Sequence, residues 1–436
     1  MGKKELLFLV GFVALVVCWT GNVNAAENNL QTELKQAQTE IQQLRTEMAE
    51  LKNSSSWQYQ TQLKQVVAQM PTAAKDEGGG GLILPAGWSI KPYGYIKLDL
   101  VYDTSSNSAG NYLLYVNPET ATNNDDDMFS ATARQTRLGM DVLAPNIGDL
   151  EVMGRVEVDF YNLQVDQENK STPMMRHAYG QLKGTGWSVL FGQTSDVVSP
   201  LFPDTLNYTV GWLGGNIGYR SPQLRYTKAM DCPSGEGKVK MEVALARQNG
   251  QDYDGVLDDG QDESAPTVQA RISGSSGGMQ AGVSGHYGRE EVNWATYPDL
   301  HTWSLNADLV VPLCPEVELK GEVFWGENLN SYLGGIGQGA NTATHDEIES
   351  VGGWAQIGLK PCDEWAINAG AGIDDPADSD LAAGARSENV FAFANVNYLF
   401  SKYLLTGIEL TCMRTEYENG GAGTNYRIQN SWMVKF

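Results

Sequence analysis

The stretch that decides the fold is TNYRIQNSWMVKF, residues 424–436, at the C-terminal end of the chain. Its side chains alternate, and one parity is apolar apart from a single interruption at Asn430: Tyr426, Ile428, Trp432, Val434 and Phe436. The other parity holds Arg427, Gln429, Ser431, Met433 and Lys435. Because successive side chains of a strand point to opposite faces, this stretch predicts a strand with one apolar and one polar side, as a transmembrane barrel needs. A soluble β-protein could end in the same way, so the rest of the chain has to decide.

The N-terminal end indicates the compartment. Lys3 and Lys4 precede an apolar run from residue 6 to residue 19, and a Val23-Asn24-Ala25 cleavage pattern follows. This predicts a secretory signal peptide over residues 1–25. No later stretch reaches the roughly 18 apolar residues of a membrane helix, so a mature chain that spans a membrane does so as a barrel. The terminal aromatic Phe436 resembles the C-terminal signature of bacterial outer-membrane barrels, and we expect the outer membrane of a Gram-negative-type bacterium.

Composition excludes one class of partner and suggests no cofactor. The formal net charge is −23, which argues against nucleic acid because the phosphate backbone would be repelled. The sequence has no CxxC motif or His/Cys cluster, so we expect neither a metal nor a cofactor. Four cysteines follow the signal peptide, and Cys314 and Cys362 fall in predicted turns on one rim. Whether these two pair is left open.

A heptad repeat precedes the alternating part of the chain. Its core positions are Leu30, Leu34, Ala37, Ile41, Leu44, Met48 and Leu51. Glu40 with Arg45, and Glu47 with Lys52, can bridge parallel helices at the g and following e positions. The repeat predicts a coiled coil over residues 26–52; an amphipathic helix packed on its own chain is the alternative. Residues 53–86 then form a helical and Gly-rich linker, and we expect the coil to lie in the periplasm.

Residues 87–436 form a run of about sixteen alternating segments. Their connections alternate between short turns and long polar loops, which is the pattern of an outer-membrane barrel. The predicted fold class is therefore an all-β transmembrane barrel of about 16 antiparallel strands, preceded by a short N-terminal α-helical coiled coil. The segments start near residues 90, 129, 149, 173, 187, 217, 238, 267, 279, 301, 316, 350, 364, 388, 402 and 424.

Alternation assigns the lumenal side chains of the first strands. Ile96, Leu98 and Leu100 share the lipid-facing parity, which turns Lys97 and Asp99 inward. The same reasoning gives a basic lumenal set of Lys97, Arg137, Arg155, Arg176 and Arg225, with Glu157 beside it. Since guanidinium forks match carboxylates, this set predicts a ladder of sites for anionic solutes. The alternative is a salt-bridge network that only keeps a wide pore open.

The predicted loop at residues 195–216 is apolar and aromatic, unlike a solvated external loop. It favours an inward fold that narrows the channel, with Phe202, Tyr208, Trp212 and Leu213 as candidate lining. Packing against a neighbouring subunit is the rival interpretation.

Several motifs resemble the DcaP-like family of outer-membrane porins, in matching order over residues 90–230. They are GYIKLDLVYD, FSATARQTRLGMDV, RVEVDFYN, MMRHAYGQL with LFGQT, and YRSPQLRYT. The resemblance implies a homotrimer of sixteen-stranded barrels with an N-terminal coiled coil, and uptake of small organic anions such as dicarboxylates. It implies substrate-binding roles for Arg137, Arg155, Glu157, Arg176 and Arg225. The turn cysteines and the very acidic loops depart from the family, which puts the substrate in doubt.

The expected function is passive diffusion of small hydrophilic solutes, favouring organic anions, through a porin embedded in outer-membrane lipid. The alternative is a structural or adhesive barrel tethered to peptidoglycan through the coiled coil. We expect no enzyme activity, because His177, His286, His301 and His345 are scattered and only His345 has an adjacent acidic residue. Peptidoglycan remains an open candidate partner for the coil in either case.

Overall fold

The computed structural model describes residues 82–84, 87–108, 112–120, 126–161, 171–232, 237–247, 265–292 and 299–436. The chain divides into two units, Met1–Ala73 and Ala74–Phe436, and every described residue belongs to the second. The predicted signal peptide, the coiled coil and the linker up to residue 81 lie outside the described residues. Within these ranges, no helix combines the length and the apolar character needed to cross a membrane.

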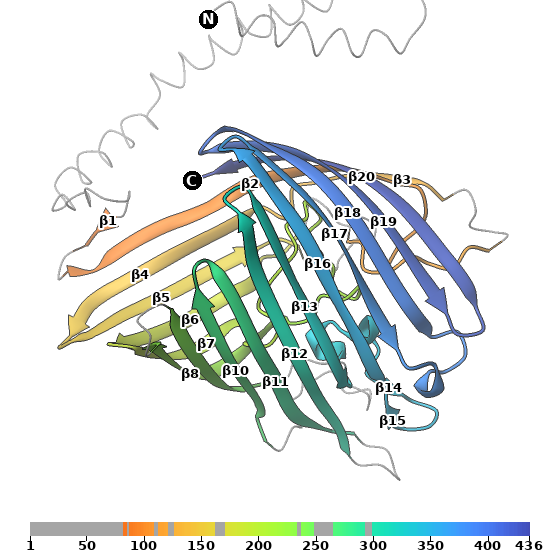
Figure 1. Ribbon diagram of the computed structural model, residues 1–436, viewed down its shortest axis with the longest axis horizontal. Coiled ribbons are helices and arrows are strands. Elements are labelled where there is room, and N and C mark those ends of the chain that lie inside the picture. The colour runs from red at the N-terminus through yellow and green to blue at the C-terminus, as the bar shows by residue number, and fades with distance from the viewer. Residues whose placement is uncertain are drawn as a thin grey trace, which may run out of the picture. The chain divides into compact units, whose positions relative to one another are not determined.

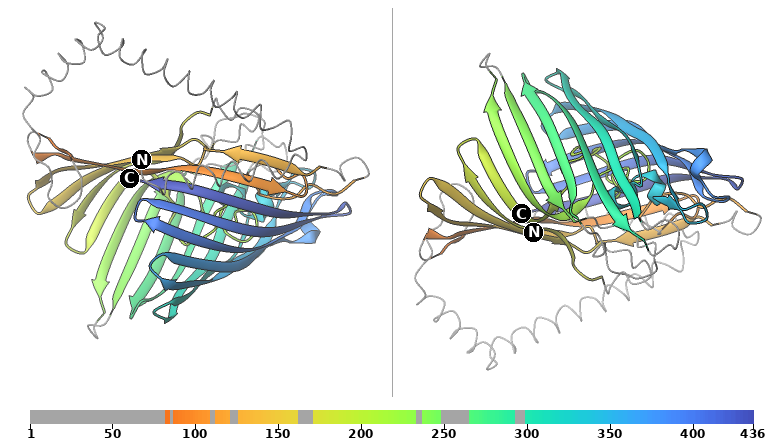
Figure 2. Two further views of the ribbon diagram at one scale, coloured as in Figure 1. Left: turned by 90° about the horizontal axis from the view of Figure 1, so that it is seen from above. Right: turned by 90° about the horizontal axis from the view of Figure 1, so that it is seen from below.

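Antiparallel strands form a closed ring (Figure 1). The first long strand, β2 (Ser89–Asp103), pairs with the last, β20 (Gly421–Lys435), and Figure 2 shows the two side by side in orange and dark blue. Closure therefore satisfies the backbone groups of both end strands, as a hydrocarbon environment requires. Between them, in chain order, lie β3 (Met128–Thr132), β4 (Arg137–Ile147), β5 (Leu150–Asp159), β6 (Met174–Gly184), β7 (Trp187–Ser195), β8 (Arg220–Asp231), β9 (Lys238–Ala246), β10 (Thr267–Ser276), β11 (Met279–Glu291), β12 (Asp299–Cys314), β13 (Val317–Glu327), β16 (Glu349–Cys362), β17 (Trp365–Pro376), β18 (Arg386–Ser401) and β19 (Leu404–Tyr417).

The ring has sixteen spanning strands. Of the 18 strands in the sheet, β1 (Leu82–Ile83) is a two-residue addition to β2, and β3 and β4 pair with successive parts of β2 as one broken segment. The predicted strand number is therefore confirmed. The break was not predicted. It lies where Thr136 Oγ1 accepts a hydrogen bond from the backbone N–H of Lys97 at 3.2 Å, so that a side chain takes the place of a ladder partner.

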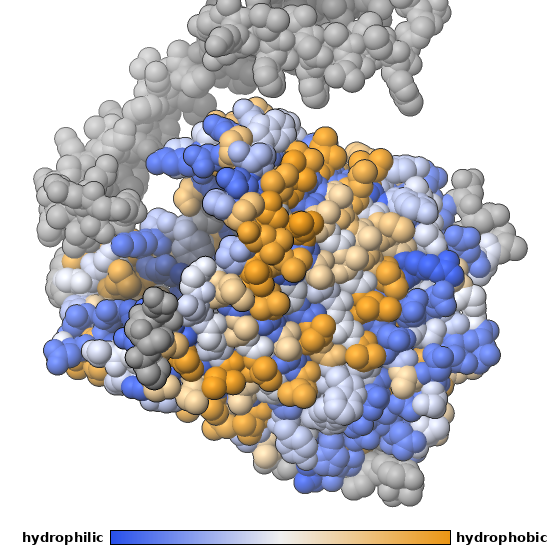
Figure 3. Space-filling view, viewed as in Figure 1, coloured by the Kyte–Doolittle hydropathy of each residue, from blue (hydrophilic) through white to orange (hydrophobic). Residues whose placement is uncertain are grey.

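Outward and inward faces alternate as the C-terminal stretch predicts. Tyr426, Ile428 and Trp432 are exposed on the outside, whereas Arg427 and Gln429 are buried inside the ring. Figure 3 shows apolar side chains gathered in an oblique band over the front strands, with hydrophilic residues on both sides of it. This arrangement is an apolar belt around a polar interior, the inverse of a soluble β-sandwich.

The seam between the two ends of the barrel depends on a glycine. Gly94 and the C-terminal Phe436 exchange backbone hydrogen bonds, with N···O distances of 3.3 Å and 3.1 Å. Gly94 has a φ of +152°, and a Cβ placed on it would lie 2.2 Å from the carbonyl oxygen of Arg137. The backbone of β2 can therefore pass between β4 and β20 only without a side chain at this position.

We expect Gly94→Ala to destabilise the barrel by about 1–3 kcal/mol, because the new Cβ strains both the backbone and the seam. Circular dichroism melting of the detergent-solubilised protein measures the effect. Gly154→Ala on β5 is the matched control, since its Cβ would meet only the Tyr179 carbonyl oxygen at 3.5 Å. Equal melting temperatures for the two variants would contradict the role of Gly94.

Cys314 and Cys362, whose pairing the sequence leaves open, are both free and exposed. Register explains why: Val317 is the partner of Cys314 on one side and of Leu359 on the other. Cys362 lies three residues beyond Leu359, about 10 Å further along its strand and two strands away. Disulfides require Cα atoms within about 7 Å.

Candidate functional site

Residues 196–219, the inner loop, connect β7 to β8 and cross the inside of the barrel (Figure 1). Five strands on one side of the ring each offer an inward side chain that accepts a hydrogen bond from a backbone N–H of this loop. The pairs are Val197 with Gln269 on β10 (3.0 Å), Ser199 with Ser284 on β11 (3.4 Å), Leu201 with Glu322 on β13 (2.7 Å), Asp204 with Gln356 on β16 (2.6 Å) and Leu206 with Glu409 on β19 (2.6 Å). The wall therefore supplies the acceptors that an extended, buried segment lacks on its own.

Carbonyl groups of the same loop are also satisfied. Lys97 Nζ and Gln429 Nε2 donate to the Leu206 carbonyl at 2.8 Å and 2.9 Å. Lys97 is 2% exposed and also contacts Asp99 at 3.1 Å. Of the predicted site residues, Lys97 thus supports the loop and does not face open solvent. Alternation predicted its inward direction but could not indicate the segment lying over it.

The second half of the inner loop packs in an aromatic cluster. Tyr208 and Trp212 lie with Tyr112 and Tyr161, and the rings of Tyr161 and Tyr208 stack at 4.1 Å. Burial raises the pKa of the Tyr208 phenol, which stays protonated and donates to Asp159 Oδ2 at 3.0 Å. The predicted inward fold of this loop is therefore confirmed, and packing against a neighbouring subunit is not needed to explain its aromatic residues.

Two external connections join this packing. Tyr112 comes from the connection after β2, and Leu333 from the one after β13. The Leu333 carbonyl accepts from the Leu213 N–H at 3.2 Å. Of the four predicted lining residues, Tyr208, Trp212 and Leu213 are buried in these contacts. Only Phe202 among them is exposed, at 37%, so the other three were wrongly predicted to line the channel.

The wall of β4 to β8 carries the predicted arginines, here called the basic wall: Arg137, Arg155, Arg176 and Arg225. The first half of the inner loop is attached along the strands from β10 to β20 and β2, whereas Arg137 and Arg155 on the other side stay 24% and 34% exposed, which indicates accessible space beside this wall. All four arginines point inward, but their carboxylate partners differ, and these partners decide what each arginine can bind.

Arg176 reaches the interior through a β-bulge. The register between β5 and β6 shifts between Glu157 and Val158, whose partners are His177 and Met175, so Arg176 has no Cα partner of its own. Both Arg176 and His177 consequently approach Glu157, at 2.8 Å and 3.8 Å. Simple alternation would put them on opposite faces. Arg176 also forms an ion pair with Asp159 at 2.7 Å, so two carboxylates compensate its charge.

Arg137 is the least engaged member of the basic wall. Its Nε lies 3.4 Å from Glu157 Oε1, and its guanidinium lies over the ring of Tyr95, 5.2 Å from the centroid. About a quarter of its side chain is exposed (24%). Tyr93 donates to the other oxygen of Glu157 at 2.9 Å, which spreads the charge of that carboxylate over several donors.

Arg155 and Arg225 are held differently. Arg155 forms a two-point contact with Asp141, with Nε–Oδ1 at 2.6 Å and Nη2–Oδ2 at 2.9 Å, and stays 34% exposed. Arg225 donates to Gln223 Oε1 at 2.9 Å and to the carbonyl of Ser195, where the inner loop begins. Arg155 is therefore accessible from the barrel interior, whereas Arg225 holds the start of the inner loop through a hydrogen bond.

The tip of the inner loop adds residues that the sequence analysis did not single out. Asp204 has a half-exposed side chain (54%), forms an ion pair with Lys320 at 2.9 Å and accepts a hydrogen bond from Gln356 Nε2 at 2.7 Å. An acidic tip thus stands inside a barrel whose opposite wall is basic. Tyr93, Tyr95 and Asp204 carry no sequence signal of their own; only the inward parity of the two tyrosines could have indicated them.

The described lysines gather at one end of the barrel. Apart from Lys97, every described lysine lies close to a short turn or at the barrel end where β2 starts and β20 ends. These lysines are Lys91, Lys183, Lys228, Lys238, Lys240, Lys320, Lys360, Lys402 and Lys435. Acidic residues such as Glu151 and Glu316 lie at the same short-turn end, so the lysines there are interspersed with carboxylates.

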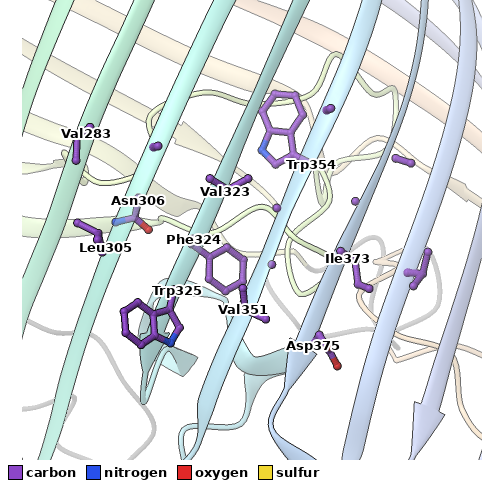
Figure 4. A pocket seen from close by; sticks show the side chains of 17 residues that line it. Val283, Leu305, Asn306, Val323, Phe324, Trp325, Val351, Trp354, Ile373 and Asp375 are labelled. Atoms are coloured by element: carbon purple, nitrogen blue, oxygen red, sulfur yellow. The ribbon is translucent and has the colours of Figure 1, made fainter.

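An apolar depression of about 1010 Å³ lies on the outward face over β11 to β18, away from the basic wall. Figure 4 shows Leu305, Val323, Trp325 and Val351 around it. These side chains are about half exposed and belong to the apolar belt. The depression belongs to the outward surface, and the polar side chains among its lining residues are Asn306 and Asp375. In the described part of the chain, no group of three or more His, Cys, Asp or Glu residues is placed to hold a metal ion.

A closed ring of sixteen strands with an inward loop after the fifth spanning strand defines a porin-type barrel. Among solved structures, the chain is similar to the outer membrane channel DcaP of Acinetobacter baumannii, with 21% identity and a TM-score of 0.67 over 82% of this chain and 99% of that one. It is also similar to the anion-selective porin from Comamonas acidovorans (11% identity, TM-score 0.54, 80% and 100% covered) and to Salmonella typhi OmpF in complex with daunomycin (13%, 0.54, 81% and 99%).

No family model and no curated protein matches the chain. At these identities the structural similarities establish the fold, and they confirm the resemblance to DcaP-like porins at that level. The roles of individual residues rest on the geometry described above.

We expect Glu409→Ala to destabilise the barrel and loosen the inner loop. Glu409 accepts from the N–H groups of Leu206 and Asn207, and each buried N–H left without an acceptor costs about 1–3 kcal/mol. Thermal melting and protease sensitivity of the loop measure the change. Glu416→Ala is the control, because Glu416 pairs with Arg414 at an exposed position. A control that melts as early as Glu409→Ala would contradict the anchoring role.

Proposed function

We propose that this protein is an outer-membrane porin through which small hydrophilic solutes diffuse passively, with a preference for organic anions such as dicarboxylates. The preference arises at the basic wall, where Arg137 and Arg155 border the open side of the barrel interior. Arg176, Arg225 and Lys97 keep the walls and the inner loop in place, and Glu157 sets the spacing between Arg137 and Arg176.

The state of Arg137 is the observation that carries this proposal. Its side chain is partly exposed, and within the described part of the chain its two terminal nitrogens donate to no protein group. The contact to Glu157 is long for a hydrogen bond, at 3.4 Å through Nε. A guanidinium held in place over Tyr95 with unused donors is a preorganised carboxylate site.

The choice of organic anions is also supported by similarity. A DcaP channel and a porin described as anion-selective share this fold, and the motifs resembling the DcaP-like family include Arg137, Arg155, Arg176 and Arg225. The carboxylate of Asp204 on the loop tip opposes anions, but its ion pair with Lys320 at 2.9 Å compensates its charge.

We further propose a homotrimer, embedded in outer-membrane lipid, with the coiled coil of residues 26–52 in the periplasm. The barrel begins at the short-turn end with β2, so a segment that precedes it emerges on the periplasmic side of a porin. The −23 net charge makes nucleic acid an unsuitable partner.

A structural barrel tethered to peptidoglycan is the second candidate. The observation that favours it is the packing of three connections inside the ring, because a filled interior serves stability and not permeation. Catalysis has less support. His286 is buried and hydrogen-bonds the hydroxyls of Ser304 and Thr302, and His177 hydrogen-bonds the Thr194 hydroxyl while lying 3.8 Å from Glu157.

Reconstitution of the purified full-length protein in planar lipid bilayers distinguishes the two candidates. A porin gives conductance steps, in triplets for a trimer, and the reversal potential in a salt gradient gives the anion-to-cation permeability ratio. The proposed porin is anion-selective, and succinate reduces its chloride current. An absence of conductance supports the structural barrel, and cation selectivity would exclude the organic-anion preference.

We expect Arg137→Gln to lower the anion-to-cation permeability ratio about fivefold. A unit charge 4 Å from an anion contributes about 1 kcal/mol even at the dielectric constant of water. Arg414→Gln is the matched control: Arg414 lies on β19, is half exposed and pairs with Glu416, so the net charge changes equally. The permeability ratio should fall only for Arg137→Gln, and an equal fall in both variants would show a mere net-charge effect.

A further inference from the structure

The Arg155–Asp141 pair has the geometry of an arginine that binds a carboxylate solute. Two parallel contacts of 2.6 Å and 2.9 Å join the guanidinium to the Asp141 carboxylate. This two-point contact is the arrangement that a free carboxylate would adopt at an arginine. Both side chains remain partly exposed, at 34% and 22%.

Other two-point pairs of the barrel interior are closed. Arg271 binds Asp308 at 2.7 Å and 3.2 Å, but their side chains are only 8% and 3% exposed. Arg427 and Asp103 form a similar pair and are fully buried. Buried pairs of this kind lock strands together, whereas solvent and solute reach the Arg155–Asp141 pair.

Arg155 also follows Arg137 along the wall. Asp141 lies four residues after Arg137 on β4, on the same face, and Arg155 is its register partner on β5. Four residues correspond to about 13 Å along a strand. Between them stands Gly139, whose missing side chain leaves room for the ring of Tyr93. Since β4 runs toward the short-turn end, Arg155 is the second guanidinium for a solute moving in that direction.

We propose that Asp141 is a specificity-determining residue that acts as an internal competitor for Arg155. Its carboxylate occupies the guanidinium until a solute carboxylate displaces it, and it returns when the solute leaves. A tethered competitor has a high effective concentration, which keeps solute binding weak and release fast. Permeation requires this balance, because a site that binds too tightly blocks the pore. The inference rests on the proposed porin function and names how its site is regulated.

The test compares the dwell time of succinate in single channels of four proteins. Asp141→Asn keeps the size of the side chain but removes the charge, so Arg155 becomes available to the solute. We expect succinate to dwell about fivefold longer, because both donors of the Arg155 fork are then available to the solute carboxylate, and screening by salt limits the gain. The maximal succinate flux into liposomes falls accordingly.

Two further variants separate this effect from others. Glu151→Gln changes the charge by the same amount at an exposed pair with Lys183, near the turn that precedes β5, and should leave the dwell time unchanged. The double variant Asp141→Asn with Arg155→Gln removes the guanidinium as well, and should abolish the gain. An equal gain in Glu151→Gln, or a gain that survives in the double variant, would overturn the proposal.

The failure of this inference is distinguishable from failure of the proposed function. If Arg137→Gln lowers anion selectivity while Asp141→Asn leaves the dwell time unchanged or shortens it, the pore favours anions but Asp141 is no competitor. If the unmodified protein itself shows no anion selectivity, the proposed function fails before the variants are compared. Equal melting temperatures of Asp141→Asn and the unmodified protein confirm that the barrel is intact.

Discussion

The rest of the structure depends on one constraint. The first half of the inner loop is extended inside the barrel and belongs to no sheet, so its backbone N–H and C=O groups need hydrogen-bond partners from elsewhere. The wall supplies them through side chains such as Gln269 on β10, Glu322 on β13 and Glu409 on β19. This places the loop along one side of the interior and leaves the other side to the basic wall. The position of open space in the barrel is thus a consequence of hydrogen-bond satisfaction.

The basic wall shows how the same residue type serves two purposes. Arg176 is neutralised by Glu157 and Asp159 and holds Tyr208, so its charge supports the packing of the loop. Arg137 and Arg155 stay partly exposed, and their charges project into the interior. Burial and the number of carboxylate partners decide whether an arginine supports the packing or exposes its charge to the interior. The residue type alone, which is all that alternation reveals, does not.

The sequence predicted the barrel well because strand alternation is a local property. The parity of residues 424–436, the strand number and the short turns could all be derived from neighbouring residues. The site was less predictable because it depends on contacts between distant segments. Lys97 was assigned to the channel, but Leu206 lies over it, 109 residues away. Arg176 was assigned to the lumen, but the bulge that brings both Arg176 and His177 to Glu157 arises from the register with β5, which a single strand does not show.

The anchors of the inner loop also have a consequence for the order of assembly. The backbone of Leu206 is hydrogen-bonded by Glu409 and Gln429, which lie 203 and 223 residues further along the chain, on β19 and β20. Contacts between residues so far apart form slowly, because the intervening chain must first be brought into position. The loop can adopt its final path only when the last strands have joined the ring. Closure of the barrel and shaping of its interior are therefore a single late event. The C-terminal strand both closes the ring and anchors the inner loop that shapes the interior.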